Sequence, residues 1–225
     1  MSAPAAIEAT LSELVARARG LAVPGERHIL GIAGAPGAGK STVAAHVVAA
    51  LGPDLAVLVA MDGFHLANVV LETLGRRDRK GAVDTFDAPG YANLLERLHR
   101  SALAPGRPGA TEITYAPEFR REIEEDIGCA IPVPPSMPLV VTEGNYLLID
   151  DSAWARARAC LDEVWFLAPA DEVRQRRLVL RHQAFGKSPD DALAWALGTD
   201  QRNAELIGST AGRADLIVRV VEGAG

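Results

Sequence analysis

The chain has 225 residues, of which 48% are apolar, and 29 acidic against 23 basic residues give it a formal charge of −6. This length and composition predict one α/β domain over residues 1–225 and exclude a globally disordered chain. An acidic chain without a basic run is not typical of nucleic-acid-binding proteins, and no apolar run is long enough to span a membrane. The two cysteines, Cys129 and Cys160, are too few for a disulfide framework and are typical of reduced thiols. We therefore expect a cytoplasmic protein with no nucleic-acid or membrane partner; a homodimer stays open.

Helical and strand patterns alternate along the chain. An amphipathic helix rather than a signal peptide is predicted at the N-terminus by the spacing of Ile7, Leu11, Leu14 and Val15. Five β-branched runs are apolar on both parities, as in strands covered on both faces: 28–33, 56–61, 139–142, 163–168 and 216–221. Helical patterns cover 42–51, 91–103, 171–185 and 190–206. This alternation predicts a five-stranded parallel sheet flanked by helices.

One connection is far longer than an ordinary loop. Residues 62–138 separate the second predicted strand from the third. A long insertion inside a compact domain is usually functional. We therefore expect this segment to form a cap over a substrate site.

The strongest motif lies between the first predicted strand and the helix that follows it. It matches the pattern GxxxxGK(S/T) and reads Gly34-Ala35-Pro36-Gly37-Ala38-Gly39-Lys40-Ser41, with Thr42 opening the helix. In such a loop, backbone N–H groups and the helix N-terminus surround phosphate oxygens. Lys40 is expected to reach the β- and γ-phosphates, and the Ser41 hydroxyl is expected to bind Mg²⁺. The sequence thus predicts a site for ATP and Mg²⁺.

Single acids follow two of the predicted strands. Asp62 follows the second strand and Glu143 follows the third. Because ligands bind outside the carboxyl ends of parallel strands, both acids are expected beside the phosphate loop. One could deprotonate an acceptor hydroxyl and the other could hold Mg²⁺. The alternative is that Asp62 caps a helix and Glu143 pairs with an arginine. No NKxD motif or strand ending in paired acids supports a GTPase or a transport ATPase.

Five segments together resemble one group of P-loop kinases: 34–41, 61–65, 79–81, 86–89 and 143–148. They are similar to the phosphoribulokinase/uridine kinase/pantothenate kinase group, above all to its bacterial fructose-transport-associated branch. The resemblance implies a P-loop NTPase fold and ATP-dependent phosphorylation of a small-molecule alcohol. It also implies that Asp62 is the catalytic base and a magnesium neighbour, that Ser41 and Glu143 complete the metal shell, and that Asp87 holds sugar hydroxyls.

Two departures leave the acceptor open. Uridine kinases carry a histidine shortly after a tyrosine that corresponds to Tyr115, and here none follows. Pantothenate kinases carry longer flanking sequences. We therefore favour a sugar or sugar derivative, with a nucleoside or pantothenate-type acceptor as the alternative. A P-loop NTPase that couples hydrolysis to binding or assembly is the alternative from a different class.

Basic residues distinguish the predicted lid and cap. Arg174, Arg177 and Arg181 share one face of the predicted helix in a lid at 171–190. Arg177 and Arg181 are expected to stabilise charge during transfer. The polar residues expected to bind the acceptor are His65, Arg79, Lys80, Asp87, Tyr115 and Arg121. A charged acceptor would suit the arginines, and a neutral polyol would suit Asp87.

Overall fold

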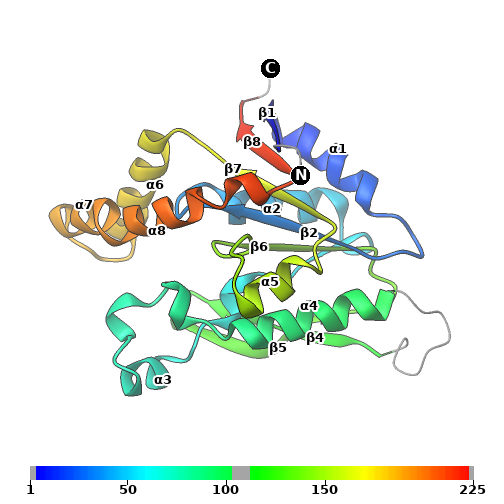
Figure 1. The fold of residues 1–225 in the computed structure, drawn as a ribbon, viewed down its shortest axis with the longest axis horizontal. Coiled ribbons are helices and arrows are strands. Elements are labelled where there is room, and N and C mark those ends of the chain that lie inside the picture. Colours follow the sequence, from blue (N-terminus) through cyan, green and yellow to red (C-terminus); the bar gives the residue numbers. More distant parts are fainter. Residues whose placement is uncertain (1–3, 103–111, 223–225) are drawn as a thin grey trace.

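The computed structural model describes residues 4–102 and 112–222. Its main feature is a parallel sheet of six strands in the order β1-β8-β7-β2-β6-β3 (Figure 1). The five predicted strands are confirmed, as β2 (His28–Gly34), β3 (Ala56–Leu58), β6 (Leu139–Gly144), β7 (Glu163–Leu167) and β8 (Leu216–Val220). The strand β3 is shorter than predicted, because the chain turns into a 3-10 helix at Met61–Phe64.

The prediction of a five-stranded sheet was wrong by one edge strand. Strand β1 (Ala5–Ala9) pairs in parallel with β8, and Ile7 lies within it rather than in a helix. Helix α1 (Leu11–Leu21) begins only after Thr10, whose hydroxyl accepts from the Glu13 N–H while the Glu13 carboxylate accepts from the Thr10 N–H. This threonine-x-x-glutamate spacing marks a helix start in the sequence. The alanine-rich strand before it has no comparable signal.

Helices cover both faces of the sheet, and alternate residues of β2 pack on opposite faces. On β2, Ile29 and Ala33 pack into a core with α4 (Ala88–Ala102) and α5 (Ser152–Arg158). Leu30 and Ile32 pack on the other face with α1 and α2 (Lys40–Leu51). Two separate hydrophobic clusters therefore hold β2 rigidly in the middle of the sheet, and the phosphate loop follows directly from its end.

The insertion between β3 and β6 is a folded cap on one side of the sheet (Figure 1). It contains short 3-10 turns at Arg77–Arg79 and Val83–Thr85, helix α3 (Asn68–Thr73) and helix α4. It also contains an antiparallel hairpin of β4 (Thr114–Arg120) and β5 (Glu125–Val133), which the sequence analysis did not predict. Pro117 and Pro132 obscure the strands, and the hairpin tolerates them because each of its strands has a free edge.

A buried arginine ties the cap back to the sheet. Arg27 immediately precedes β2, and its guanidinium donates to the carbonyl oxygens of Leu98 in α4, and of Pro135 and Met137 beyond β5. Backbone carbonyls thus compensate the burial of its charge. Two distant parts of the insertion are thereby fixed to the strand that carries the phosphate loop.

The remaining helices follow β7, and the first of them lies in the segment predicted as a lid. Helix α6 (Asp171–Ala184) follows β7, as expected. The single helix predicted at 190–206 is instead two helices, α7 (Pro189–Leu197) and α8 (Thr199–Gly208), which meet at Gly198. A Cβ at Gly198 would lie 2.8 Å from the carbonyl oxygen of Ala194, which explains the glycine at this break. The last residue of the helix predicted at 91–103 lies outside the described residues.

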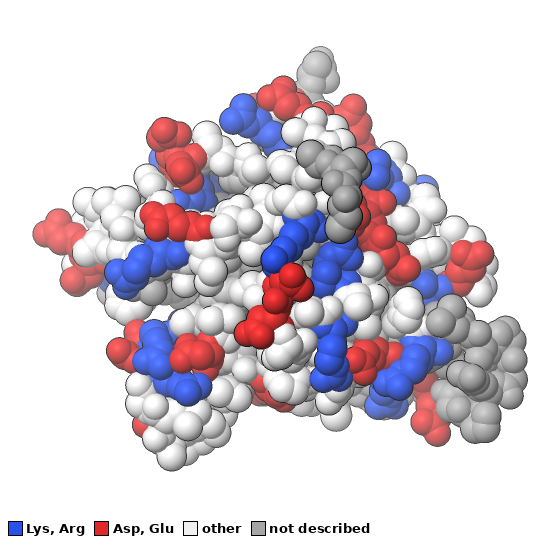
Figure 2. All heavy atoms as spheres, in the orientation of Figure 1, with Lys and Arg blue, Asp and Glu red and all other residues white. Residues whose placement is uncertain are grey.

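The surface carries both signs of charge. On the face shown in Figure 2, acidic and basic side chains are interspersed among uncharged residues, and no broad basic area is visible there. Among the described residues, no helix combines the length and the apolar character that a membrane span requires.

Candidate active site

The phosphate loop joins β2 to α2. Gly37 and Gly39 have φ angles of 80° and 95°, in the left-handed region that favours glycine. No side chain caps the N-terminus of α2, whose N-cap residue is Gly39. The backbone donors at this helix start are therefore available to an anion, and the helix dipole favours one.

Lys40 lies back across the loop and is buried. Its ammonium donates to the carbonyl oxygen of Ala35 (3.2 Å) and to Oδ1 of Asn145 (2.6 Å). Burial lowers the pKa of Lys40, and the nearby carboxylates of Glu143 and Asp62 oppose that shift. Asn145 lies within the segment at 143–148 that carries the family resemblance, and no role was predicted for it. Its position two residues after Glu143 was the available signal.

Glu143 brings a carboxylate to the start of α2. It lies in β6 opposite Ile32 of β2, is 5% exposed, and accepts from the Ser41 hydroxyl at 2.8 Å. Burial raises the pKa of Glu143, the charge of Asp62 raises it further, and Lys40 opposes both. Within the described residues, no group of three or more His, Cys, Asp and Glu could hold a metal by itself. A hydroxyl and carboxylates fit Mg²⁺, which keeps several waters and phosphate oxygens as ligands.

Asp62 lies in the 3-10 turn after β3, and its charge acts on both Lys40 and Glu143. The Arg121 guanidinium lies 3.7 Å from its carboxylate. The structure thus brings together Lys40 and Ser41 at the start of α2, Asp62 after β3 and Glu143 in β6, which are three separate segments. The predicted acceptor residue Arg121 joins them from the turn of the cap hairpin.

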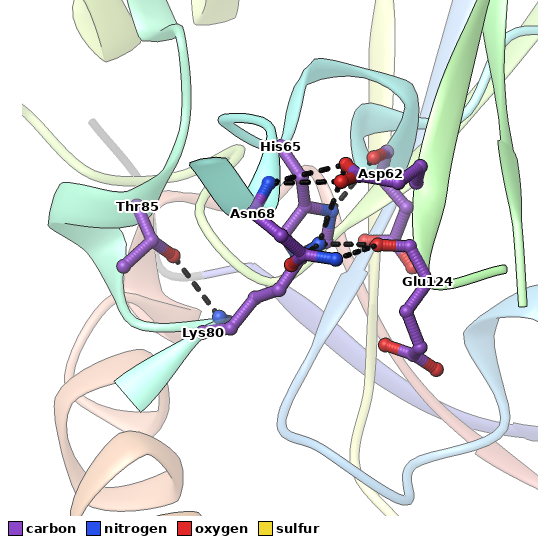
Figure 3. A network of polar contacts seen from close by, with 8 residues as sticks. Asp62, His65, Asn68, Lys80, Thr85 and Glu124 are labelled. Atoms are coloured by element: carbon purple, nitrogen blue, oxygen red, sulfur yellow. Dashed lines mark hydrogen bonds and ion pairs between the residues drawn. The ribbon is translucent and has the colours of Figure 1, made fainter. Parts of the chain in front are cut away.

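His65 has structural partners. Its Nδ1 donates to the carbonyl oxygen of Asp62 (2.7 Å), and its ring stacks on Phe86 and Phe119 at centroid distances of 4.0 and 4.9 Å. Burial lowers the pKa of His65, which favours a neutral imidazole. His65 therefore fixes the turn that carries Asp62 against the hairpin (Figure 3).

Lys80 also fixes the hairpin. Figure 3 shows its ammonium between Asn68 and the hairpin turn, where it donates to Oδ1 of Asn68 (2.8 Å) and to the carbonyl oxygen of Glu124. The same ammonium lies 5.4 Å from the centre of the Phe119 ring. Lys80 thus joins the early part of the cap to the turn that carries Arg121.

The other predicted acceptor residues lie elsewhere in the cap. Arg79 forms an ion pair with Asp84 at 2.8 Å. Asp87 accepts from the Gly90 N–H (2.9 Å), which caps α4. Tyr115 lies on β4 and is 51% exposed. Among the described residues, none of these three forms a hydrogen bond or an ion pair with Asp62 or Lys40.

Tyr146 links the motif after β6 to the cap. Its hydroxyl donates to the carbonyl oxygen of Gly81 at 2.7 Å, and the Gly81 N–H donates to Thr85 Oγ1. The arginine-lysine-glycine segment at 79–81 is thus held by the residue that follows Asn145. Sequence analysis missed this contact, because a buried tyrosine has many possible partners.

The three lid arginines lie at different depths. Arg174 is buried and forms an ion pair with Asp171, and its backbone packs on Gly37. The Arg177 guanidinium lies 3.3 Å from where a Cβ of Gly39 would be. Arg181 is exposed, yet surrounding protein lowers its pKa, and the charge of Arg121 lowers it further. The face of α6 that carries these arginines thus begins at the phosphate loop, and the charge of its last arginine interacts with that of Arg121 in the hairpin turn.

A cavity of about 740 Å³ lies beside the phosphate loop. Its walls come from the loop, from the ends of β7 and β8, from α6 and from the start of α1, and they include Ala38, Leu167, Pro169, Arg177, Val220 and Leu11. Its volume is within the range of small-molecule sites.

A model of the family described as "Phosphoribulokinase / Uridine kinase family" matches residues 29–224. The chain belongs to this family. It is 35% identical to the "putative fructose transport system kinase" of Silicibacter sp. TM1040, with a TM-score of 0.77 over 93% of this chain and 98% of that one. It is 33% identical to the ATP-dependent kinase-like protein notR' of Aspergillus versicolor, over 65% of this chain and 86% of the relative. It is 31% identical to a "putative uridine kinase" of Schizosaccharomyces pombe, over 77% and 74%.

Family membership makes the chain a small-molecule kinase with a P-loop fold that binds a nucleotide. The names of these relatives point to different acceptors, since one refers to fructose transport and another to uridine. The family therefore leaves the acceptor of this chain undetermined.

Proposed function

We propose that this kinase uses Mg²⁺-bound ATP to phosphorylate a hydroxyl group of a sugar or sugar derivative. The observation that carries the proposal is the position of Asp62. Its carboxylate is close enough to Lys40 and Glu143 to shift the pKa of both, and it lies on the turn that opens the cap. An acid between the phosphate loop and a cap is the group that an acceptor alcohol needs.

The proposed reaction is an in-line transfer. The acceptor hydroxyl gives its proton to the Asp62 carboxylate as its oxygen bonds to the γ-phosphorus, and the bond from that phosphorus to ADP breaks. Lys40 stabilises the negative charge on the phosphoryl oxygens, and Arg177 and Arg181 add positive charge from the lid. Ser41, Glu143 and Asp62 would hold Mg²⁺, which would neutralise part of the phosphate charge.

The nucleotide site is proposed over residues 34–42 and the adjoining cavity. Phosphate oxygens would lie on the loop and the start of α2. The mostly apolar cavity beside Ala38 and Arg177 would take the nucleoside, since it opens directly from the loop. A nucleoside or pantothenate-type acceptor in the cap is the alternative within the same class. An NTPase without an acceptor is the alternative from another class.

Acceptor-dependent ADP release tests this proposal. We expect ADP release to need an added small alcohol in a screen of pentoses, hexoses, polyols, sugar acids, sugar phosphates, nucleosides and pantothenate. Turnover that ignores every acceptor, or that only a protein stimulates, would support the NTPase instead.

The Asp62→Asn variant tests the base. General-base catalysis contributes roughly 10²–10⁴-fold, so we expect transfer to fall by about that factor while calorimetry still detects ATP binding. Asp54→Asn, at an exposed position before β3, is the matched control and should behave as wild type. Excess Mg²⁺ should recover only the part of the loss that comes from metal binding. Full recovery would make Asp62 a metal ligand only.

A further inference from the structure

Two guanidinium groups from different elements approach the proposed reaction site. Arg121 comes from the turn of the cap hairpin, and Arg181 comes from α6 in the lid. Neither side chain forms a hydrogen bond with any described residue, and the nearest ion-pair contact is the one between Arg121 and Asp62 at 3.7 Å. That distance is too long for a hydrogen bond. The donors of both groups therefore remain available to a ligand.

The two arginines repel each other. The charge of Arg121 lowers the pKa of Arg181, and both arginines lower the pKa of Lys40. Like charges held close together favour an anion between them. ATP accounts for Lys40, which belongs to the phosphate loop. Arg121 belongs to the cap, which is the side of the acceptor.

Several contacts hold the hairpin turn that carries Arg121 in place. The turn that carries it is held by the Lys80 ammonium through the Glu124 carbonyl oxygen, and Phe119 on the adjoining strand stacks on His65. Glu124 has a φ angle of 54°, so the turn holds a non-glycine residue in the left-handed region. The neighbouring Arg120 differs, because its guanidinium is already paired with Glu118 of the same strand at 2.6 Å.

These observations lead to an inference about the acceptor. We propose that the acceptor alcohol carries an anionic group, a carboxylate or a phosphate, and that Arg121 binds this group. The inference rests on the proposed kinase function and names its substrate class. The alternative of a neutral polyol as acceptor relied on Asp87 to bind its hydroxyls. In the structure the carboxylate of Asp87 already caps α4.

Matched acceptors test the inference. Wild-type enzyme is assayed with a sugar and its sugar acid, and with a sugar and its sugar phosphate, so that each pair differs only in the anion. We expect kcat/KM for one anionic member to exceed that of its neutral partner by roughly 10- to 100-fold, as for hydrogen bonds to charged groups. The acid and phosphate arms identify which anion it is. Equal or better use of the neutral member of every pair would overturn the inference and leave the kinase proposal intact.

Arg121→Gln separates acceptor binding from an effect on Asp62. If Arg121 binds the acceptor anion, the variant raises KM for the anionic acceptor by about 10-fold or more, and it changes KM for ATP and kcat/KM for neutral acceptors by a much smaller factor. Arg120→Gln, one residue away on the same hairpin, is the matched control and should change neither KM. A fall in kcat that is equal for anionic and neutral acceptors would mean that Arg121 only serves Asp62, and it would contradict the inference.

A binding measurement needs no known acceptor. With the phosphate loop filled by a saturating non-hydrolysable ATP analogue and Mg²⁺, titration with inorganic phosphate should show a weak site in the wild type and the Arg120→Gln variant. Arg121→Gln should lose it. Phosphate binding that survives in the Arg121 variant, or that is absent from the wild type, would contradict the inference. Failure of the ATP analogue itself to bind would contradict the proposed function instead.

Discussion

In the phosphate loop, Lys40 is held by a carbonyl five residues before it and by one amide from the end of β6. In the cap, the turn that carries Arg121 is held by contacts among Lys80, Asn68 and Glu124, which are 12 to 56 residues apart. Lys40 thus takes one of its two contacts from its own loop, whereas the turn with Arg121 is held by side chains from other parts of the cap. We therefore expect changes within the cap to alter the choice of acceptor and to leave nucleotide binding unchanged.

Among the variants that test this comparison, the largest effect should come from the loop. Lys40→Ala removes a buried charge from the transferring phosphates, and we expect turnover to fall by about 10²–10³-fold, as when one preorganised donor to a developing charge is lost. Circular dichroism should show a folded protein. Near-normal activity in the folded variant would contradict the assignment of this loop as the phosphate-binding site.

Glu143 is the next position to test, through its pH dependence. Because its pKa is raised, protons compete with Mg²⁺ at a higher pH than for an ordinary glutamate. We expect the affinity for Mg²⁺ to fall as the pH is lowered, and Glu143→Gln to bind Mg²⁺ at least about tenfold more weakly without that pH dependence. Nucleotide-bound protein titrated with Mg²⁺ at several pH values measures this.

The metal-free protein offers a second reading of Glu143. A carboxyl group whose pKa is raised by folding binds its proton more tightly in the folded state than in the unfolded state. The free energy of unfolding should therefore rise as the pH falls from the folded pKa towards the ordinary glutamate pKa of 4.5. Chemical denaturation of wild type and Glu143→Gln should show this slope in the wild type alone. An equal slope in both proteins would place the shift on another group.

Tyr146→Phe should loosen the cap without affecting the loop. It removes the hydrogen bond to the Gly81 carbonyl oxygen, and we expect the free energy of unfolding to fall by about 1 kcal/mol and the acceptor KM to rise a few-fold. Tyr91→Phe is the control, because its buried hydroxyl contacts Thr142 of β6 instead of the 79–81 segment. A similar loss of stability without a change in acceptor KM is expected for Tyr91→Phe. An equal rise in acceptor KM in both variants would show that the contact between Tyr146 and Gly81 has no specific effect on acceptor binding.

The smallest effect concerns Asp87. Asp87→Ala removes the cap of α4 and should lower the free energy of unfolding by about 1 kcal/mol, whereas Asp87→Asn can still cap the helix and should change it by much less. We expect the acceptor KM of the Asn variant to stay near that of the wild type. A large rise in that KM at unchanged stability would show that Asp87 contacts the acceptor, as the family resemblance implies.

The sequence predicted the site best where residue types at a fixed spacing serve one known function. The phosphate loop and its flanking strand and helix were predicted because glycines, a lysine and a serine at fixed spacing serve a single purpose. The acids Asp62 and Glu143 were predicted at strand ends because parallel strands bring those ends to one edge.

The cap was much harder to predict. Its hairpin contains prolines, and its polar contacts join residues far apart in the chain, so no local pattern shows that Lys80 supports Glu124 or that Tyr146 contacts Gly81. Edge strand β1 was missed for a related reason, since its stability comes from pairing with β8 at the other end of the sequence. Local patterns predict local structure, and these contacts are not local.

The packing of Gly37 has a consequence for motion. A Cβ at this position would lie 2.7 Å from the carbonyl oxygen of Arg174 and 2.9 Å from Leu178 Cγ, so the first turns of α6 rest directly on the phosphate loop. We therefore expect the first turns of α6 to stay with the loop, while the part of the helix beyond Leu178 is held by α8 through the 2.7 Å contact between His182 and Asp200. Amide hydrogens near Arg174 should exchange more slowly than those around the junction of α6 and α7, and a ligand bound at the loop should change exchange most in the first turns of α6.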